Sequence, residues 1–359
     1  MNELRLLFNE LKDSFNKLRI LPYAEDAMKD TTIMKEKLFL SRYACLSSDT
    51  KGRKLPEEPC VMRTEFQRDR DRIIHSKAFR RLKNKTQVFV APQGDHFRTR
   101  LTHTLDVAQI ARSIARALNL NEDLTEAIAL AHDLGHTPYG HMGEDALSEL
   151  TDGKFRHNEQ SVRVLEVIEK DGQGLNLTFE VLDGVLNHRS DGHPSTLEGK
   201  AVMFADKIAY INHDIDDAIR AGLITRNDLP KVESEILGDT ATKRINTMIT
   251  ALVGQSLDKP VLEMEAEVFA AMKSMRSYLF RNVYGPNGGN RDRIKVKRLL
   301  GYLFEYFVSH IDEMPDEYRR LAEIWGAETA VCDYISGMTD NYASALFLNL
   351  TVPRSGDKF

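Results

Sequence analysis

The spacing of apolar residues is the feature that most constrains what this chain can fold into. Apolar side chains recur at steps of three and four along nearly the whole chain, and the period-two alternation of half-buried strands is almost absent. A helix that carries its apolar residues on one face must bury that face against other helices. We therefore predict an all-α fold. Helices are expected over 64–85, 101–118, 123–133, 158–170, 198–221, 228–254, 260–284, 291–311, 316–325 and 327–337.

The first sixty residues follow a weaker pattern. A narrow apolar seam runs from Leu4 to Leu18, and it predicts a helix that docks on its own domain or on a partner subunit. Residues 20–60 are more polar and contain prolines, so we expect irregular connections with short helices. Thr64 and Gln67 then have the spacing of a capping box, which predicts the start of the next helix.

The composition is that of an ordinary globular protein and leaves the binding partner open. Of the 359 residues 42% are hydrophobic, and the net charge of −5 gives no overall attraction to nucleic acid or to an anionic membrane. Cys45, Cys60 and Cys332 show no C-x-x-C spacing, so we expect neither a disulfide framework nor a thiolate metal site. Apolar runs are too short for a membrane span, and charges interrupt the first helix, which argues against a signal peptide. These features predict a cytoplasmic protein.

The stretch "ALAHDLGHTPYGHMGE", residues 129–144, gathers three histidines and two carboxylates around a turn. A short turn joins its helix to the preceding one, so His103 at the start of one helix can approach His132 and Asp133 at the end of the next. Asp206 lies in an apolar helical frame, where a charge needs a partner. Two imidazoles and two carboxylates suit a divalent ion such as Mn, Mg, Fe, Ni or Zn.

Two further polar residues follow the turn. Gly135 and Pro138 end the preceding helix, so His141 and Glu144 belong to the next segment, where a spacing of three places them on one helical face. Glu144 can orient the imidazole, and His141 can exchange a proton with an attacking water or a leaving oxygen near neutral pH. We predict an acid–base pair; an ion-paired surface histidine is the alternative.

Six sequence blocks occur in order between Pro59 and Leu350. They read "RDRIIHSKAFRRLKNKTQVF", "RTRLTHTLDVAQIARSIARAL", "AHDLGHTPYGHMGE", "ADKIAYINHDIDDA", "NVYGP" and "VCDYISGMTDNYA". In this order they resemble the HD-domain phosphohydrolases, and more closely the bacterial deoxynucleoside triphosphate triphosphohydrolases, the dGTPase-like proteins. The chain departs from common family residues at Thr137 and Tyr139, neither of which is a ligand position.

The resemblance implies an all-α HD fold and hydrolysis of a deoxynucleoside triphosphate (dNTP) to deoxynucleoside and tripolyphosphate. It also implies a homo-oligomer, a tetramer or hexamer, for which a second dNTP can act as activator, and it points to His141 and Glu144 as the catalytic pair. The implied domain limits are a lead-in over 1–60, a single helical domain over 61–350 with an HD core at about 98–217, and a tail over 351–359. The implied ligands of one divalent ion are His103, His132, Asp133 and Asp206.

The resemblance also suggests substrate contacts. A triphosphate carries about four negative charges, so its hydrolysis needs cations around the phosphates. The candidates for this role are Arg100, His136, His157, Lys207 and Arg276. The positions that match sugar contacts in relatives are Gln87, Val88, Tyr210, Asp214, Arg276 and Tyr284. Tyr284 would be a steric gate against a ribose 2′-hydroxyl, with a core aromatic as the alternative; Asp214 could instead cap a helix or pair with Arg220.

Two basic clusters need separate interpretation. Residues 63–85 hold nine Lys/Arg against three acids. A nucleic-acid surface is one reading, but a solvated or intersubunit face with Arg–Asp pairing is favoured. The second cluster lies within 291–298, and the resemblance suggests that such clusters meet nucleotides or nucleic acid between subunits, without pointing to single residues.

Two other classes of function stay open. Another HD phosphohydrolase, such as a nucleotidase or cyclic-nucleotide phosphodiesterase, would not need the sugar contacts. A nucleic-acid-binding or scaffold protein with a silent HD site is disfavoured because all four ligand positions are intact.

Overall fold

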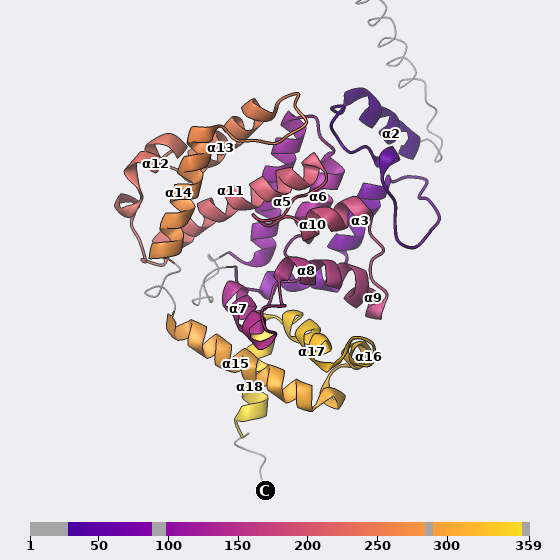
Figure 1. Ribbon diagram of the computed structural model, residues 1–359, viewed down its shortest axis with the longest axis vertical. Helices are drawn as coiled ribbons and strands as arrows, with labels where there is room; N and C mark the ends of the chain where they lie inside the picture. Colours follow the sequence, from indigo (N-terminus) through magenta and orange to yellow (C-terminus); the bar gives the residue numbers. More distant parts are fainter. Residues whose placement is uncertain (1–27, 88–97, 284–289, 354–359) are drawn as a thin grey trace, which may run out of the picture.

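The computed structural model describes residues 28–87, 98–283 and 290–353 (Figure 1). Within those ranges the regular structure is helical, and extended pairing is limited to two isolated bridges. The prediction of an all-α fold is confirmed. The predicted seam from Leu4 to Leu18 lies outside the described residues. Among the described helices, none combines the length and apolar character needed to cross a bilayer.

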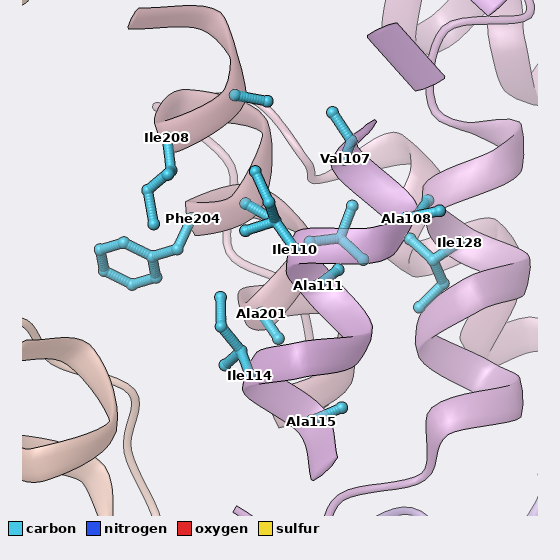
Figure 2. Close-up of a cluster of buried hydrophobic side chains, with 14 of the residues drawn as sticks. Val107, Ala108, Ile110, Ala111, Ile114, Ala115, Ile128, Ala201, Phe204 and Ile208 are labelled. Atoms are coloured by element: carbon cyan, nitrogen blue, oxygen red, sulfur yellow. The ribbon is translucent and has the colours of Figure 1, made fainter. Parts of the chain in front are cut away.

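Three helices form the centre of the molecule: α5 (Arg100–Ala117), α6 (Glu122–Ala131) and α11 (Leu197–Arg220). They agree closely with three predicted ranges. Asn121 begins α6 by accepting a hydrogen bond from Leu124 N at 3.2 Å, as a good N-cap residue does. Branched and small side chains of α5 are buried between α6 and α11 (Figure 2). Burial of each large one stabilises the fold by about 1.5–3 kcal/mol before entropy is counted.

Further helices surround this centre. The capping box that opens α3 is confirmed, because Gln67 Oε1 accepts a hydrogen bond from Thr64 N at 3.1 Å. The predicted stretch 228–254 is two helices, since Gly238 adopts a φ of 112°, a conformation that glycine tolerates best. The surrounding helices are α2 (Met28–Phe39), α3 (Glu65–Ile74), α4 (Lys77–Arg81), α8 (His157–Arg163), α9 (Glu169–Gly172), α10 (Phe179–Leu186), α12 (Lys231–Leu237), α13 (Ala241–Ser256) and α14 (Ala266–Asn282).

The C-terminal helices build a second hydrophobic cluster, at the bottom of Figure 1. Side chains such as Leu300, Phe307 and Ile335 are buried in it, together with Leu147 of α7. Helix α7 therefore belongs to both the site and this cluster. The helices are α7 (Gly140–Leu150), α15 (Asn290–Ser309), α16 (Asp316–Trp325), α17 (Ala327–Ser336) and α18 (Asp340–Thr351).

Asp340, the first residue of α18, ties this cluster to two segments beside the site. Its Oδ2 accepts a hydrogen bond from Thr86 N at 2.9 Å, and its Oδ1 accepts one from Tyr139 N at 2.9 Å. Tyr139 has a φ of 62°, a left-handed conformation that is strained for a non-glycine residue. The contact from Asp340 holds this turn immediately before α7.

Lys85 makes a second tie at the same junction. Its Nζ donates to the carbonyl oxygens of His136, at 2.5 Å, and Ser336, at 2.7 Å. Burial, reinforced by nearby Arg100, lowers the pKa of Lys85 to about 7. A neutral amine has two N–H groups, and both find acceptors here.

The basic segment 63–85 pairs with acids of the same chain. Arg70 Nη1 lies 2.8 Å from Asp123 Oδ1, and Arg72 Nη2 lies 2.8 Å from Glu57 Oε1. This pairing supports the favoured reading of the segment as an ion-paired face.

Candidate active site

Twelve of the sixteen predicted site residues line one cavity of about 540 Å³. Its walls come from α5, the turn after α6, the start of α7 and α8, and the middle of α11 and α14. The prediction that His141 and Glu144 share a helix after the turn is confirmed by α7. The predicted residues that line the cavity are Gln87, Arg100, His103, Asp133, His136, His141, Glu144, His157, Asp206, Lys207, Tyr210 and Arg276.

The four predicted metal ligands meet at one place, and three of them, His103, Asp133 and Asp206, line the cavity. Donor atoms of His103, His132 and Asp133 all lie within 4.8 Å of one another. Asp206 Oδ1 completes the set, 3.1 Å from His103 Nε2 and 3.8 Å from His132 Nε2. These residues come from α5, the end of α6 and α11, so the three central helices jointly position the donor set.

The turn that carries His132 and Asp133 is fixed by close packing. A Cβ atom on Gly135 would lie 2.2 Å from Ser161 N of α8, so only glycine fits. The Ser161 hydroxyl donates to the carbonyl of His132 at 2.8 Å and accepts from Gly135 N at 2.9 Å. The end of α6 is therefore bound to α8 before any ligand is considered.

His132 shows that the donor set fits a metal ion. Its Nδ1 lies 2.6 Å from the carbonyl oxygen of Ala129, which fixes the proton on that nitrogen. Its Nε2 is buried and has no hydrogen bond within the described part of the chain. A buried polar atom is normally paired, so an inward-facing lone pair among carboxylates is the arrangement expected of a metal ligand.

Arg100 contacts one carboxylate of the predicted donor set. Its side chain is 1% exposed, and Nη1 donates to Asp133 Oδ2 at 2.7 Å. Burial raises the pKa of Asp133, but electrostatic interaction with the neighbouring side chains, His132 and Arg100 first, holds that pKa well below its usual range. Arg100 thus keeps a ligand carboxylate ionised and oriented, while its phosphate contact stays a prediction.

Glu144 connects two histidines. Its Oε1 lies 2.8 Å from His157 Nδ1, and its Oε2 lies 3.5 Å from His141 Nδ1. Burial opposes ionisation of Glu144, but the hydrogen bonds from His141 and His157 lower its pKa far below the ordinary value. The His141 side chain is 48% exposed whereas that of Glu144 is 13% exposed. The carboxylate is thus fixed in the wall and the imidazole reaches the open cavity.

Further histidines extend this group. His136 stacks on His157, with ring centroids 4.0 Å apart. His188, which sequence reasoning missed, lies with Nε2 3.2 Å from His157 Nε2. Burial, and then neighbouring His132 and His157, lowers the pKa of His188 to about 3, so this ring is neutral. Its only sequence signal was a histidine shortly after an apolar stretch.

The remaining predicted contacts divide into three groups. Lys207 and Arg276 line the cavity, and Arg276 Nη1 donates to Ser190 Oγ at 3.3 Å. Asp214 is buried on α11, outside the cavity lining formed by the described residues. Val88 and Tyr284 lie outside the described residues.

Family models identify the class of protein. Residues 100–211 match the HD domain, and residues 262–348 match the phosphohydrolase-associated domain. The helical fold and the His/Asp donor set agree with these matches. The molecule is thus an HD-domain phosphohydrolase.

Curated relatives extend the match to most of the chain. A deoxyguanosinetriphosphate triphosphohydrolase-like protein of Caldanaerobacter subterraneus subsp. tengcongensis is 58% identical, over 91% of this chain and 96% of its own. One of Clostridium perfringens is 49% identical, over 89% and 96%. The chain belongs to this dGTPase-like family. A crystal structure of a phosphohydrolase from Bacteroides thetaiotaomicron shares the fold, with a TM-score of 0.50, 18% identity, and coverage of 79% of this chain and 69% of that one.

Proposed function

We propose that the protein hydrolyses dNTPs to deoxynucleoside and tripolyphosphate with the help of one divalent ion. The observation that carries this proposal is a single cavity that joins a two-histidine, two-carboxylate donor set to an exposed histidine backed by a carboxylate. The first group suits an ion, and the second suits proton transfer. The names of the relatives support a triphosphate substrate.

The residues divide the chemical work. His103, His132, Asp133 and Asp206 would hold the ion, which when bound supplies Lewis-acid stabilisation of phosphoryl charge. Lys207 and Arg276 place positive charge on the cavity wall for the phosphates. His141 is positioned to take a proton from the attacking water or to deliver one to the departing 5′-oxygen. Glu144 keeps the imidazole oriented during that exchange.

The cell compartment and the assembly belong to the same proposal. Cys45, Cys60 and Cys332 are free thiols, which suits a reducing cytoplasm. A homo-oligomer with a second dNTP as activator follows from the family resemblance. Sedimentation with and without added dNTP tests whether the protein is a homo-oligomer and whether a dNTP changes its assembly.

Product analysis tests the activity. Metal-free protein is supplied with Mg²⁺ or Mn²⁺ and each dNTP, singly and mixed, and the phosphate products are separated. We expect tripolyphosphate and deoxynucleoside in equal amounts, with ¹⁸O from labelled water in tripolyphosphate. GTP should be a poor substrate compared with dGTP. Release of orthophosphate or pyrophosphate, or label in the nucleoside, would contradict the proposal and favour another HD phosphohydrolase reaction.

A further inference from the structure

A line of three side chains runs from the donor set to the surface. His103 Nδ1 lies 3.3 Å from His213 Nδ1, and His213 Nε2 lies 3.0 Å from Asp106 Oδ2. Asp106 follows His103 on α5, and His213 lies two turns after Asp206 on α11, so helix packing brings them together. The side chains of His103 and His213 are 1% and 6% exposed, while that of Asp106 is 43% exposed.

The hydrogen-bond chemistry of this line allows one arrangement with two neutral rings. An ionised carboxylate only accepts, so Asp106 requires a proton on His213 Nε2. A neutral His213 then has a lone pair on Nδ1, which must accept a hydrogen bond from His103 Nδ1. The proton of His103 is thereby placed on Nδ1, and its Nε2, the atom 3.1 Å from Asp206, carries a lone pair.

The opposite arrangement would disable the ligand. If His213 Nδ1 donated to His103 Nδ1, the proton of a neutral His103 would occupy Nε2, and no lone pair would face the donor set. In His132 the proton is fixed on Nδ1 by a backbone carbonyl, that of Ala129 at 2.6 Å. For His103, the pair His213 and Asp106 takes the place of that carbonyl as the hydrogen-bond partner of Nδ1.

We propose that His213 and Asp106 are positioning residues that fix the tautomer of His103 as a metal ligand. The inference rests on the proposed metal site. Outer-shell partners of this kind change metal affinity by about 10- to 100-fold when removed. This positioning role gives a function to His213, which is next to the predicted sugar contact Asp214 and contacts His103 of α5.

The test compares His213→Leu with His213→Asn in the full-length protein, using Mn²⁺ affinity measured by calorimetry. His213→Leu should weaken Mn²⁺ binding by about 10- to 100-fold. His213→Asn should restore most of it, because the amide oxygen can accept from His103 Nδ1. Asn212→Ala is the matched control: Asn212 is buried on the same helix and accepts from Arg244 Nε at 2.9 Å, so its loss should lower the melting temperature without changing Mn²⁺ affinity.

A second variant and a spectroscopic measurement test the proposal even if His213→Leu does not fold. Asp106→Leu changes a partly exposed side chain and should weaken Mn²⁺ binding in the same direction. ¹⁵N NMR of the wild-type protein with Zn²⁺ should show His103 protonated on Nδ1 and His213 protonated on Nε2. Wild-type Mn²⁺ affinity in both His213→Leu and Asp106→Leu, or the reversed tautomers, would contradict the positioning role of His213 and Asp106. Absence of metal binding by the wild type would instead contradict the proposed function.

Discussion

The two sides of the active-site cavity differ in their contact with solvent. The ligand wall, defined as His103, His132, Asp133 and Asp206, contains histidine side chains that are each 1% exposed. The open rim, defined as His141, Lys207 and Arg276, includes a histidine side chain that is 48% exposed. Metal binding needs lone pairs that are fixed and desolvated, whereas proton exchange and substrate entry need access. Under the proposed function, the same residue type, histidine, would serve two purposes according to the burial of its side chain.

The largest effect is expected in the ligand wall. Asp206→Ala should remove most bound metal and essentially all activity, because a missing carboxylate leaves the site open and its charge unbalanced. Metal content by mass spectrometry and turnover by tripolyphosphate release measure this, and the wild type should hold about one ion per chain. Asp191→Ala, which removes an exposed carboxylate from the same cavity, is the control and should retain the metal. An active, metal-depleted Asp206→Ala protein would refute the assignment.

His141→Ala separates the two sides of the cavity. Loss of general acid–base help should lower kcat by about 10²–10⁴-fold. The metal content should stay at the wild-type level, because His141 lies outside the ligand wall. Steady-state kinetics and metal analysis on the same preparation give both values. Near-normal kcat would show that His141 is a surface histidine paired with Glu144.

A smaller effect is expected from a rim cation. Arg276→Ala should raise KM for dNTP by about 10-fold, since a charge-assisted hydrogen bond contributes about 1.5–3 kcal/mol. Lys273→Ala removes the same charge from the same helix outside the cavity lining, so its KM should change far less. Equal KM changes in the two variants would indicate a general field effect without direct contact.

The last effect is on stability and concerns Lys85, whose Nζ donates to the carbonyl oxygen of His136, a residue of the cavity lining. The folded protein releases the Lys85 proton with a pKa of about 7, whereas the unfolded chain keeps it to about 10.5. Between these values the unfolded state binds more protons, so the free energy of unfolding should rise with pH, by at most about 1.4 kcal/mol per pH unit. Urea unfolding from pH 7 to 9 should show a smaller rise in Lys85→Met than in the wild type. Parallel curves would mean that Lys85 does not titrate in this range.

The sequence predicted the residues of the ligand wall better than the neighbouring side chains that contact them. Periodicity located α5 and α11, and the placement of His103 and Asp206 on them followed from one face of each helix. Periodicity does not say which side chain of a neighbouring helix a residue will meet. For this reason the contacts of Arg100 with Asp133 and of His103 with His213 were missed, while the phosphate contact of Arg100 stays a prediction.

Other features of the fold were not predicted, in part because they depend on contacts between residues far apart in the sequence. Helices α10 and α18 were not predicted, and nothing local in the sequence links Asp340 to Thr86, 254 residues away. Such contacts depend on packing of the whole molecule. Short-range patterns predicted the helices and the donor set, and the family resemblance implied the hydrolase activity, whereas the shape of the cavity needed the assembled fold.

The contacts of Asp340 also order events during synthesis on the ribosome. Tyr139 binds Asp340, which is translated 201 residues later. The segments that supply all four members of the ligand wall are translated before Asp340. Domains begin to fold during translation, so we expect a nascent chain to present the ligand wall before the turn at Tyr139 and the Thr86 segment are secured. Translation of α18 would then be the step that secures the turn at Tyr139 next to a proposed ion site that is already formed.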